Sequence, residues 1–409
     1  MLNRIWTAFF FVAFLAGLGR WLIGGDGDVW QELVASLFDM AKVGFEIALG
    51  LTGVMALWLG IMRVGERGGA VDLLARAFGP LFRRLFPGVP AGHAAEGAIV
   101  MNMAANMLGL DNAATPLGLK AMRELQDLNP SDDTASNDQV LFLVINTSAV
   151  TVLPVTIFTY RAQLGAADPT DVFLPLLIAT FFSTLAGLIV TAAVQRLRLF
   201  EPVVLAYLGG LTALIAGTVV YFAQLPQEAM ETQSTLLANL LIFSVVIVFF
   251  GLAVRRRVNL YEAFVEGAKD GFTTAVTIIP YLIAMLVAIG VLRASGALDL
   301  ALDGVRWAVA SAGLDTRWVD GLPTALMKPL SGSGARGLLI ETMNAHGADS
   351  FAGRLASVVQ GSTETTFYVL AVYFGAVKIR HTRHALGCGL AADVAGIIAA
   401  ILVSYLFFG

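Results

Sequence analysis

The sequence predicts an all-α polytopic membrane protein built from inverted-topology repeats, and three observations point to this fold class. The 409 residues are 57% hydrophobic and 14% charged, with a mean hydropathy of +0.77, whereas soluble domains average about 45–50% apolar and 25% charged residues. Runs of about 20 apolar residues, the length that crosses the hydrocarbon core, recur along the chain. Segments of the first half also return in the same order in the second half.

The apolar runs predict the membrane spans. The N-terminal run is interpreted as an uncleaved span, because no small-x-small cleavage site clearly follows it. Two further stretches, 91–122 and 321–345, are apolar but interrupted, and each predicts a re-entrant helical hairpin. The predicted spans are residues 6–24, 42–63, 138–160, 171–195, 201–223, 233–253, 271–292, 353–375 and 385–407.

The basic residues predict the orientation in a bacterial cytoplasmic membrane. With the N-terminus in the cytoplasm and the C-terminus outside it, the clusters Arg83/Arg84 and Arg255–Arg257 are cytoplasmic, as the positive-inside rule requires. The opposite loop "FAQLPQEAMETQS" contains no Lys or Arg. Residues 70–86, "AVDLLARAFGPLFRRLF", have apolar residues at helical spacing with interleaved arginines, so we expect a helix along the cytoplasmic interface.

The repeats are the most informative feature of the sequence. Four pairs of segments align in the same order: 44–74 with 271–301, 108–122 with 329–343, 145–155 with 359–369, and 184–189 with 393–398. Four full spans separate 42–63 from 271–292, so the second copy starts from the opposite face of the membrane. Inverted repeats with broken helices are typical of secondary transporters. The predicted domains are a first repeat with the N-terminal span (1–200), a two-helix linker (201–257) and a second, inverted repeat (258–409).

Polar residues in the middle of two spans predict broken helices. Asn146, Thr147 and Ser148 lie at the centre of 138–160, and Gln360, Gly361 and Ser362 occupy the equivalent place in 353–375. The ends of half-helices there would offer dipoles and free carbonyl groups to a substrate or a cation. Alternatively, small hydroxyl residues only allow helices to pack closely.

Two carboxylates lie within apolar segments, Glu364 and Asp393. An ionisable group at that depth costs at least about 2.5 kcal/mol and is functional by default. We expect Glu364 to bind substrate or carry a proton, and Asp393 to take part in ion or proton coupling. The alternatives are that Glu364 pairs with Arg336 or Arg354, and that Asp393 holds helices together.

The two hairpins contain further candidate binding residues. Amides in the first supply both donors and acceptors, which suits a neutral polar ligand. The second, "KPLSGSGARG", has backbone N–H groups freed by glycines, which suits an anion or a carbonyl group; flexibility of a gating tip explains the same glycines. The candidates are Asn102, Asn106, Asp111, Asn112 and Thr115 in the first hairpin, and Ser331, Ser333 and Arg336 in the second.

Several function classes are excluded by the sequence. The net charge of −4 without a large basic patch gives no support for nucleic-acid binding. The lone Cys388 excludes an intrachain disulfide and leaves no zinc signature. There is no GxGxxG, Walker A, Ser-His-Asp set or metal quartet, so we expect no enzyme, no ATP-driven pump, no metal and no cofactor beyond a coupling Na⁺ or H⁺.

The stretches "NMAANMLGLDNAATPLG" and "PLSGSGARG … QGSTETTFYVLAVYFG" closely resemble those of bacterial spore maturation proteins A and B, here fused, with residues 1–200 like A and about 230–409 like B. Those proteins belong to a grouping named for a nucleoside-recognition or gate domain. The order of hairpin, broken helix and closing helix is similar to the transport domain of concentrative nucleoside transporters. The resemblance implies that substrate and coupling ion bind at Asn106–Thr115, Asn146–Ser148, Ser331–Arg336 and Gln360–Thr365, a range that includes Thr363 and Thr365.

The leading hypothesis is an ion- or proton-coupled secondary transporter of a small polar solute, nucleoside-like compounds included. Its hairpin domain would move in an elevator-like way against spans 42–63 and 271–292. A lipid or lipid-linked precursor translocase shares the inverted repeats but needs a laterally open groove. A non-transporting envelope assembly factor that binds partner membrane proteins is the third hypothesis. The expected partners are the solute and membrane lipids, and homo-oligomerisation is left open.

Overall fold

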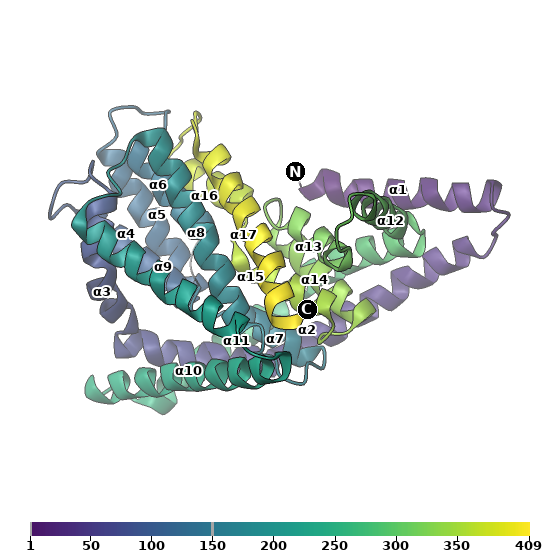
Figure 1. Cartoon of the computed structure of the whole chain (residues 1–409), viewed down its shortest axis with the longest axis horizontal. Helices are drawn as coiled ribbons and strands as arrows, with labels where there is room; N and C mark the ends of the chain where they lie inside the picture. The colour runs from purple at the N-terminus through teal and green to yellow at the C-terminus, as the bar shows by residue number, and fades with distance from the viewer. Residues whose placement is uncertain (1, 149–150) are drawn as a thin grey trace. The chain divides into compact units, whose positions relative to one another are not determined.

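A computed structural model describes residues 2–148 and 151–409, without the side chains of residues 2 and 111–113 (Figure 1). Every regular element in this part is helical. Seven of its helices are long and apolar enough to cross a membrane. The chain is therefore an α-helical multi-pass membrane protein. These seven helices are α1 (Leu2–Leu22), α2 (Val29–Gly68), α8 (Phe173–Gln195), α9 (Pro202–Ala223), α10 (Gln227–Arg255), α11 (Leu260–Ala294) and α17 (Ala385–Phe408).

Two of the expected spans are broken into half-helices. Span 138–160 is divided into α6 (Asn137–Thr147) and α7 (Val155–Gln163), and span 353–375 into α15 (Phe351–Ser362) and α16 (Thr366–Ala376). At the end of α6 the hydroxyl groups of Thr147 and Ser148 both donate to the carbonyl oxygen of Val144, at 2.9 and 2.8 Å. Hydroxyl side chains that bond to the local backbone compete with helix propagation. The first break therefore begins at Ser148, the last of the three predicted residues, whereas Asn146 and Thr147 still belong to α6.

The second break lies later than predicted. Gln360 and Ser362 remain in the last turn of α15, and the non-helical residues are 363–365. The prediction placed the break at Gln360–Ser362 because these residues occupy the place in span 353–375 that is equivalent to Asn146–Ser148. The break occurs instead within the Thr- and Ser-rich run that follows, since such side chains favour helix ends over helix interiors.

Both interrupted stretches form a pair of packed helices joined by a short turn. The first pair is α4 (Ala94–Met107) and α5 (Asp111–Asp127), and Gly109 in its turn has φ +68°. The second pair is α13 (Leu322–Met327) and α14 (Gly332–His346). A left-handed φ favours glycine because a Cβ would clash with the backbone.

The helices α2 and α11 are longer than the predicted spans. They contain 40 and 35 residues, which corresponds to about 60 and 52 Å at 1.5 Å per residue, against about 30 Å of hydrocarbon. The prediction began the first of them at residue 42, because charged residues before that point end the apolar run. Each is followed by a left-handed glycine, Gly69 (φ 86°) or Gly296 (φ 78°), and then by a shorter helix, α3 (Ala70–Leu85) or α12 (Ala297–Ser311).

Helices α2 to α8 and α11 to α17 therefore follow the same order: a long helix, a short helix after a left-handed glycine, a helix pair, a broken helix and a closing helix. The predicted helix over 70–86 is confirmed as α3. It buries Val71, Leu81 and Leu85 and exposes Arg83 and Arg84.

The chain divides into two compact units, and both contain segments from each half. The first unit comprises residues 1–58, 156–169 and 268–360, and the second comprises residues 59–155, 170–267 and 361–409. The division falls inside α2 and inside α11.

In the first unit, α2 and α11 are antiparallel and in close contact. A Cβ built on Gly44 would lie 3.2 Å from the Cα of Ile283, and one on Gly271 would lie 2.6 Å from the Cα of Ala56. The alignment of the repeats pairs Gly44 with Gly271 and Ala56 with Ile283. Exchanging the two copies thus converts one contact into the other, as expected for a two-fold relation.

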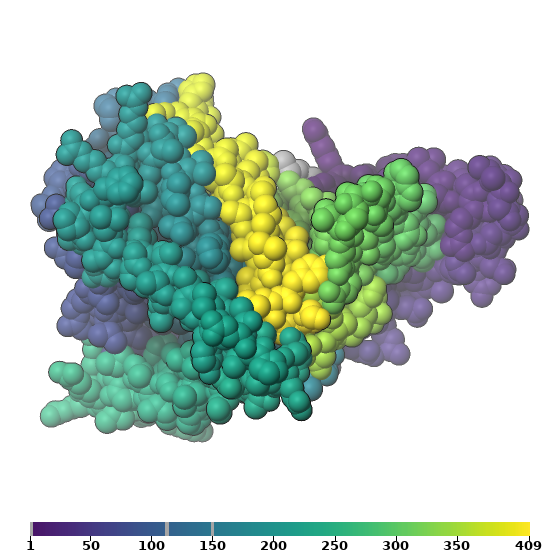
Figure 2. All heavy atoms as spheres, viewed as in Figure 1, coloured from purple at the N-terminus to yellow at the C-terminus, as the bar shows by residue number. Residues whose placement is uncertain are grey.

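In the second unit, the closing helices α8 and α17 pack in the same manner. Figure 2 shows α17, in yellow, along the teal-blue segment of α8. Cβ atoms built on Gly187 and Gly396 would each lie 3.0 Å from a Cβ of the other helix, that of Ala392 or Ser183 respectively. As the numbers on α8 rise, those on α17 fall, so these helices are antiparallel too. The alignment pairs Ser183 with Ala392 and Gly187 with Gly396, which again gives contacts that exchange with the copies.

Candidate functional site

The site is built from the first broken helix upward. Asn146 lies in the last turn of α6, where its Nδ2 donates to the carbonyl oxygen of Phe142 at 2.8 Å. Its Oδ1 accepts from Nδ2 of Asn106, on α4, at 2.8 Å. Ser136 and Gln139 form a capping box that starts α6, which fixes the helix that carries Asn146. Two predicted candidates, Asn106 and Asn146, are therefore in direct contact.

The turn between α4 and α5 bonds to the same break. The N–H of Val152, after α6, donates to the carbonyl oxygen of Met107 at 2.7 Å. Within the helix pair, Nδ2 of Asn102 donates to the carbonyl oxygen of Ala114 at 2.7 Å and so connects α4 to α5. The side chains of Asp111 and Asn112, both predicted candidates, lie outside the described residues.

Thr115 is joined to the site by a residue that sequence reasoning missed. The hydroxyl group of Tyr373, on α16, lies near the side chains of Asn102 and Thr115 and interacts with both electrostatically. The Tyr373 ring also lies over Gly118 of α5, since a Cβ there would be 2.5 Å from its hydroxyl oxygen. A residue of the second repeat thus completes the first helix pair.

The two breaks meet directly. The N–H of Glu364 donates to the carbonyl oxygen of Thr147 at 2.7 Å. We call the set formed by both breaks and the α4–α5 turn the break junction (residues 107–110, 147–148, 151–154 and 363–365). Breaking a helix leaves N–H and C=O groups unsatisfied, and at this point each break satisfies a group of the other.

The side chains of the second break differ in burial. Ser362, Thr363 and Thr365 are buried, and Thr363 Oγ1 has no hydrogen-bond partner among the described residues. The Glu364 side chain, expected to be buried because its segment is apolar, is exposed. The reason is the break itself: outside a helix, the backbone of Glu364 turns toward Thr147, and its side chain points away from the buried face.

The closing helices reach the junction from equivalent positions. On α8, the Thr184 hydroxyl donates to the carbonyl oxygen of Ser148, in the first break. On α17, Oδ2 of Asp393 accepts from the Thr366 hydroxyl, at the start of α16, at 2.6 Å. Thr184 and Asp393 are paired by the repeat alignment. Asp393 is 1% exposed, so the second copy places a carboxyl group where the first has a hydroxyl group.

The remaining predicted residues, Ser331, Ser333, Arg336 and Gln360, lie in the first unit. Ser331 caps α14 by accepting from the N–H of Gly334 at 3.0 Å, and its hydroxyl oxygen lies 3.3 Å from that of Ser333. The Arg336 Nε donates to the carbonyl oxygen of Gly332 at 3.2 Å, and its side chain also bonds the Tyr160 hydroxyl. Gln360 is buried, and its Oε1 has no partner among the described residues.

Two further polar residues of the first unit escaped sequence reasoning. Lys328, in the turn between α13 and α14, is 5% exposed. Arg161, on α7, is completely buried; it donates to the carbonyl oxygen of Ala348 at 2.7 Å and pairs with Asp349 at 3.1 Å. A charged residue inside an apolar segment was the available signal. Thr184 could have been found through its alignment with Asp393.

Known proteins share both repeats. The family model described as nucleoside recognition gate matches residues 48–164 and 275–380. Spore maturation protein B of Bacillus subtilis (strain 168) is 50% identical over 154 residues, which are 38% of this chain and 85% of that protein. Spore maturation protein A of the same organism is 36% identical over 190 residues, 46% of this chain and 93% of that protein. No solved structure matches. The chain therefore belongs to the nucleoside recognition gate family, as a fused protein similar to spore maturation proteins A and B.

Proposed function

We propose that the protein is a secondary transporter of a small polar solute, and that the break junction belongs to its binding site. The observation that carries this proposal is the hydrogen bond from Glu364 N–H to Thr147 O, because it brings two broken helices of two repeats to one point. Broken helices at corresponding positions mark the substrate and ion sites of secondary transporters.

Inverted topology is part of the proposal, and the antiparallel contacts support it. If two spanning helices occupy equivalent positions in two copies and run antiparallel, the copies have opposite orientations in the membrane. The pairs α2/α11 and α8/α17 meet this condition independently, one in each compact unit. The helix pairs α4–α5 and α13–α14 are then the re-entrant hairpins, and the N-terminus is cytoplasmic.

The chemistry of the junction favours a neutral polar solute. Asn102, Asn106 and Asn146 offer both donors and acceptors, and hydroxyl groups surround them. This suits ligands with amide-like edges and hydroxyl groups, and the family name makes nucleosides and nucleobases the first compounds to test. Within the first unit, Ser331, Ser333, Arg336 and Gln360 are proposed as solute-binding residues of the second copy.

Asp393 is the proposed coupling group. Its carboxyl group bonds to Thr366, the residue that directly follows the break junction, and is 1% exposed, whereas the carboxyl group within the junction, that of Glu364, is exposed. A carboxyl group within a membrane-spanning helix marks a proton or ion pathway in transporters. We further propose that the hairpin domain moves in an elevator-like way against α2 and α11, the long helices of the two copies.

The experiment is solute uptake by proteoliposomes. Purified protein is reconstituted and supplied with radiolabelled nucleosides, nucleobases, amino acids or small acids under a Na⁺ or H⁺ gradient. The proposal expects at least one solute to accumulate under one gradient, and Asp393→Asn to abolish that dependence. If a folded protein moves no solute under any gradient, the proposal is wrong. The envelope-assembly hypothesis, to which the names of the spore maturation relatives point, would then replace it.

A further inference from the structure

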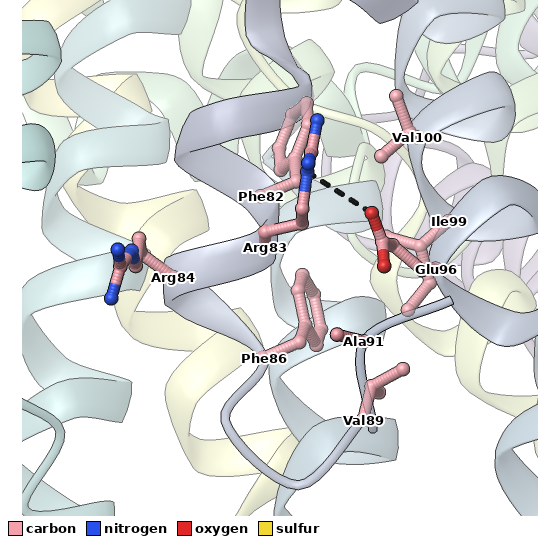
Figure 3. Close-up of a pocket in the computed structure, with 9 residues that line it drawn as sticks. All are labelled: Phe82, Arg83, Arg84, Phe86, Val89, Ala91, Glu96, Ile99 and Val100. Atoms are coloured by element: carbon pink, nitrogen blue, oxygen red, sulfur yellow. Dashed lines mark ion pairs between the residues drawn. The ribbon is translucent and has the colours of Figure 1, made fainter. Parts of the chain in front are cut away.

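A hollow of about 290 Å³ lies away from the break junction, between the end of α3, the loop that follows it and the first turns of α4 (Figure 3). Its floor is apolar: Phe82, Phe86, Ile99 and Val100 line it and are at least nine-tenths buried. The proposed transport function assigns no role to this hollow. All its lining residues belong to the second unit.

Opposite charges stand side by side at its edge. Nε of Arg83 lies 3.0 Å from Oε1 of Glu96, as Figure 3 shows, and the two side chains are 58% and 23% exposed. Glu96 is held in place because its other oxygen accepts from the N–H of Gly92 at 3.1 Å. Arg84 also lines the hollow but points to the other side of α3, where it lies 3.6 Å from Glu201. The local charges therefore form a dipole rather than a single-sign patch.

An exposed ion pair of this kind is worth little, so a ligand with both charges can replace each half at small cost. Arg83 has guanidinium N–H groups beyond the one that faces Glu96, and a guanidinium group suits phosphate oxygens. Glu96 accepts hydrogen bonds from a primary ammonium group, whereas a quaternary ammonium group has no N–H to donate. The apolar floor suits the glycerol backbone and the first methylene groups of an acyl chain.

We propose that this hollow binds a phospholipid with a phosphoethanolamine headgroup, with phosphate at Arg83 and ammonium at Glu96. Helix α3 has one buried and one basic face, which is typical of a helix at the membrane surface, where such headgroups are concentrated. The proposal rests on the chain's being a membrane protein and not on its transporting a solute.

The test is lipid retention measured by native mass spectrometry of the full chain. Equal amounts of phosphatidylethanolamine, phosphatidylcholine and phosphatidylglycerol are offered, and the expected order is phosphatidylethanolamine first. Arg83→Gln should weaken retention of that lipid about fivefold, the effect of one arginine at a membrane surface. Glu96→Gln should abolish the preference over phosphatidylcholine while retaining phosphate binding.

Arg76→Gln is the matched control, because Arg76 is on the same helix, bonds to the carbonyl oxygen of Asp72 in its own helix and does not line the hollow. It should leave retention unchanged, and equal melting temperatures should show that all three variants are folded. Soluble glycerophosphoethanolamine is added as a competitor, to distinguish binding of the headgroup from binding of the whole lipid. It should compete only weakly with phosphatidylethanolamine. Equal retention of the three lipids, a preference for phosphatidylglycerol, or no effect of Arg83→Gln and Glu96→Gln would overturn the proposal.

Discussion

The contact between α2 and α11 and the contact between α8 and α17 have the same symmetry but different chemistry. In both, glycines of one copy face small or apolar residues of the other, and exchanging the copies exchanges the contacts. Around Gly44, Gly271, Ala56 and Ile283 the α2/α11 contact is apolar; elsewhere along it Ser36 faces Gly290, and Arg63 and Arg67 pair with Glu266. The α8/α17 contact adds a hydrogen bond from the Ser183 hydroxyl to the carbonyl oxygen of Ala392 at 2.9 Å. The next residues, Thr184 on α8 and Asp393 on α17, bond to Ser148 and Thr366 respectively.

This difference separates architecture from function. Close packing requires only small residues, and both contacts have them. A buried titratable group in hydrocarbon is expensive, and among the symmetry-related positions described above only Asp393 on α17 is one. We infer that duplication supplied the scaffold and that the copies diverged where the closing helices reach the breaks.

The largest effect is expected at the α2/α11 contact. Gly271→Leu should lower the free energy of unfolding by about 3 kcal/mol, because the new Cβ would lie 2.6 Å from the Cα of Ala56 and the backbone must move. Gly53→Leu is the control, since nothing lies within 4 Å of a Cβ built there on α2. Denaturant titration of both variants checks this. Equal stability of the two would show that the close approach of α2 and α11 is wrong.

A smaller effect is expected when Asp393 is truncated. Asp393→Ala removes the acceptor of the Thr366 hydroxyl and should cost about 1–3 kcal/mol, the price of a buried polar group without a partner. Asp393→Asn keeps an acceptor oxygen and should stay within about 1 kcal/mol of the unmodified chain. Comparing Asp393→Ala with Asp393→Asn therefore distinguishes an effect on stability from an effect on coupling. Asparagine as damaging to stability as alanine would mean that the carboxylate is structural.

Thr184 gives the matched experiment in the first copy. Thr184→Val removes the hydrogen bond to the carbonyl oxygen of Ser148 and should cost about 1 kcal/mol. Because threonine does not titrate, solute uptake should keep its pH dependence. The exchange Thr184→Asp with Asp393→Thr should move that dependence to the first copy. Loss of pH dependence in Thr184→Val alone would contradict the division of roles.

The smallest effect concerns the start of the two closing helices. Burial, and then the neighbouring Arg383, hold the pKa of His384 below its ordinary value; α8 starts after Val172, which does not titrate. The unfolded chain therefore binds a proton on the His384 imidazole more readily than the folded chain does. The contribution of His384 to stability that is present above about pH 6.5 is consequently lost as the pH falls through the folded-state pKa. His384→Gln should flatten this slope in melting temperatures measured from pH 7.5 to 5. An unchanged slope would assign the dependence to another group.

Much of the architecture could be predicted because hydrophobic runs and repeats report it directly. The alignment paired Gly44 with Gly271 and Thr184 with Asp393 before any contact was known. The start of α2 was missed because the helix continues through charged residues, among them Glu32 and Asp39, that end the apolar run. The length of an apolar run reflects the thickness of the hydrocarbon that it crosses, and it does not predict the length of the whole helix.

The site was predictable in its residue types and not in its pairings. Asn106 and Asn146 were singled out separately, but their hydrogen bond depends on how the α4–α5 pair packs on α6, which periodicity does not encode. The exposed side chain of Glu364 was missed for a related reason. Burial was inferred from the apolar neighbours in sequence, whereas the break displaces this residue from the helix that they form.

The central claim, that the two copies face each other in opposite orientations, is tested most directly by cysteine cross-linking in native membranes, in a Cys388→Ser background. Nε2 of Gln195, at the end of α8, lies 2.9 Å from Nε2 of His384, just before α17, so a short thiol-reactive cross-linker should join the pair Gln195→Cys/His384→Cys rapidly. The repeat alignment pairs Gln195 with Ser404, about 30 Å farther along α17, so Gln195→Cys/Ser404→Cys should not cross-link. Cross-linking of the second pair and not the first would mean that α8 and α17 are parallel, and the account would be contradicted.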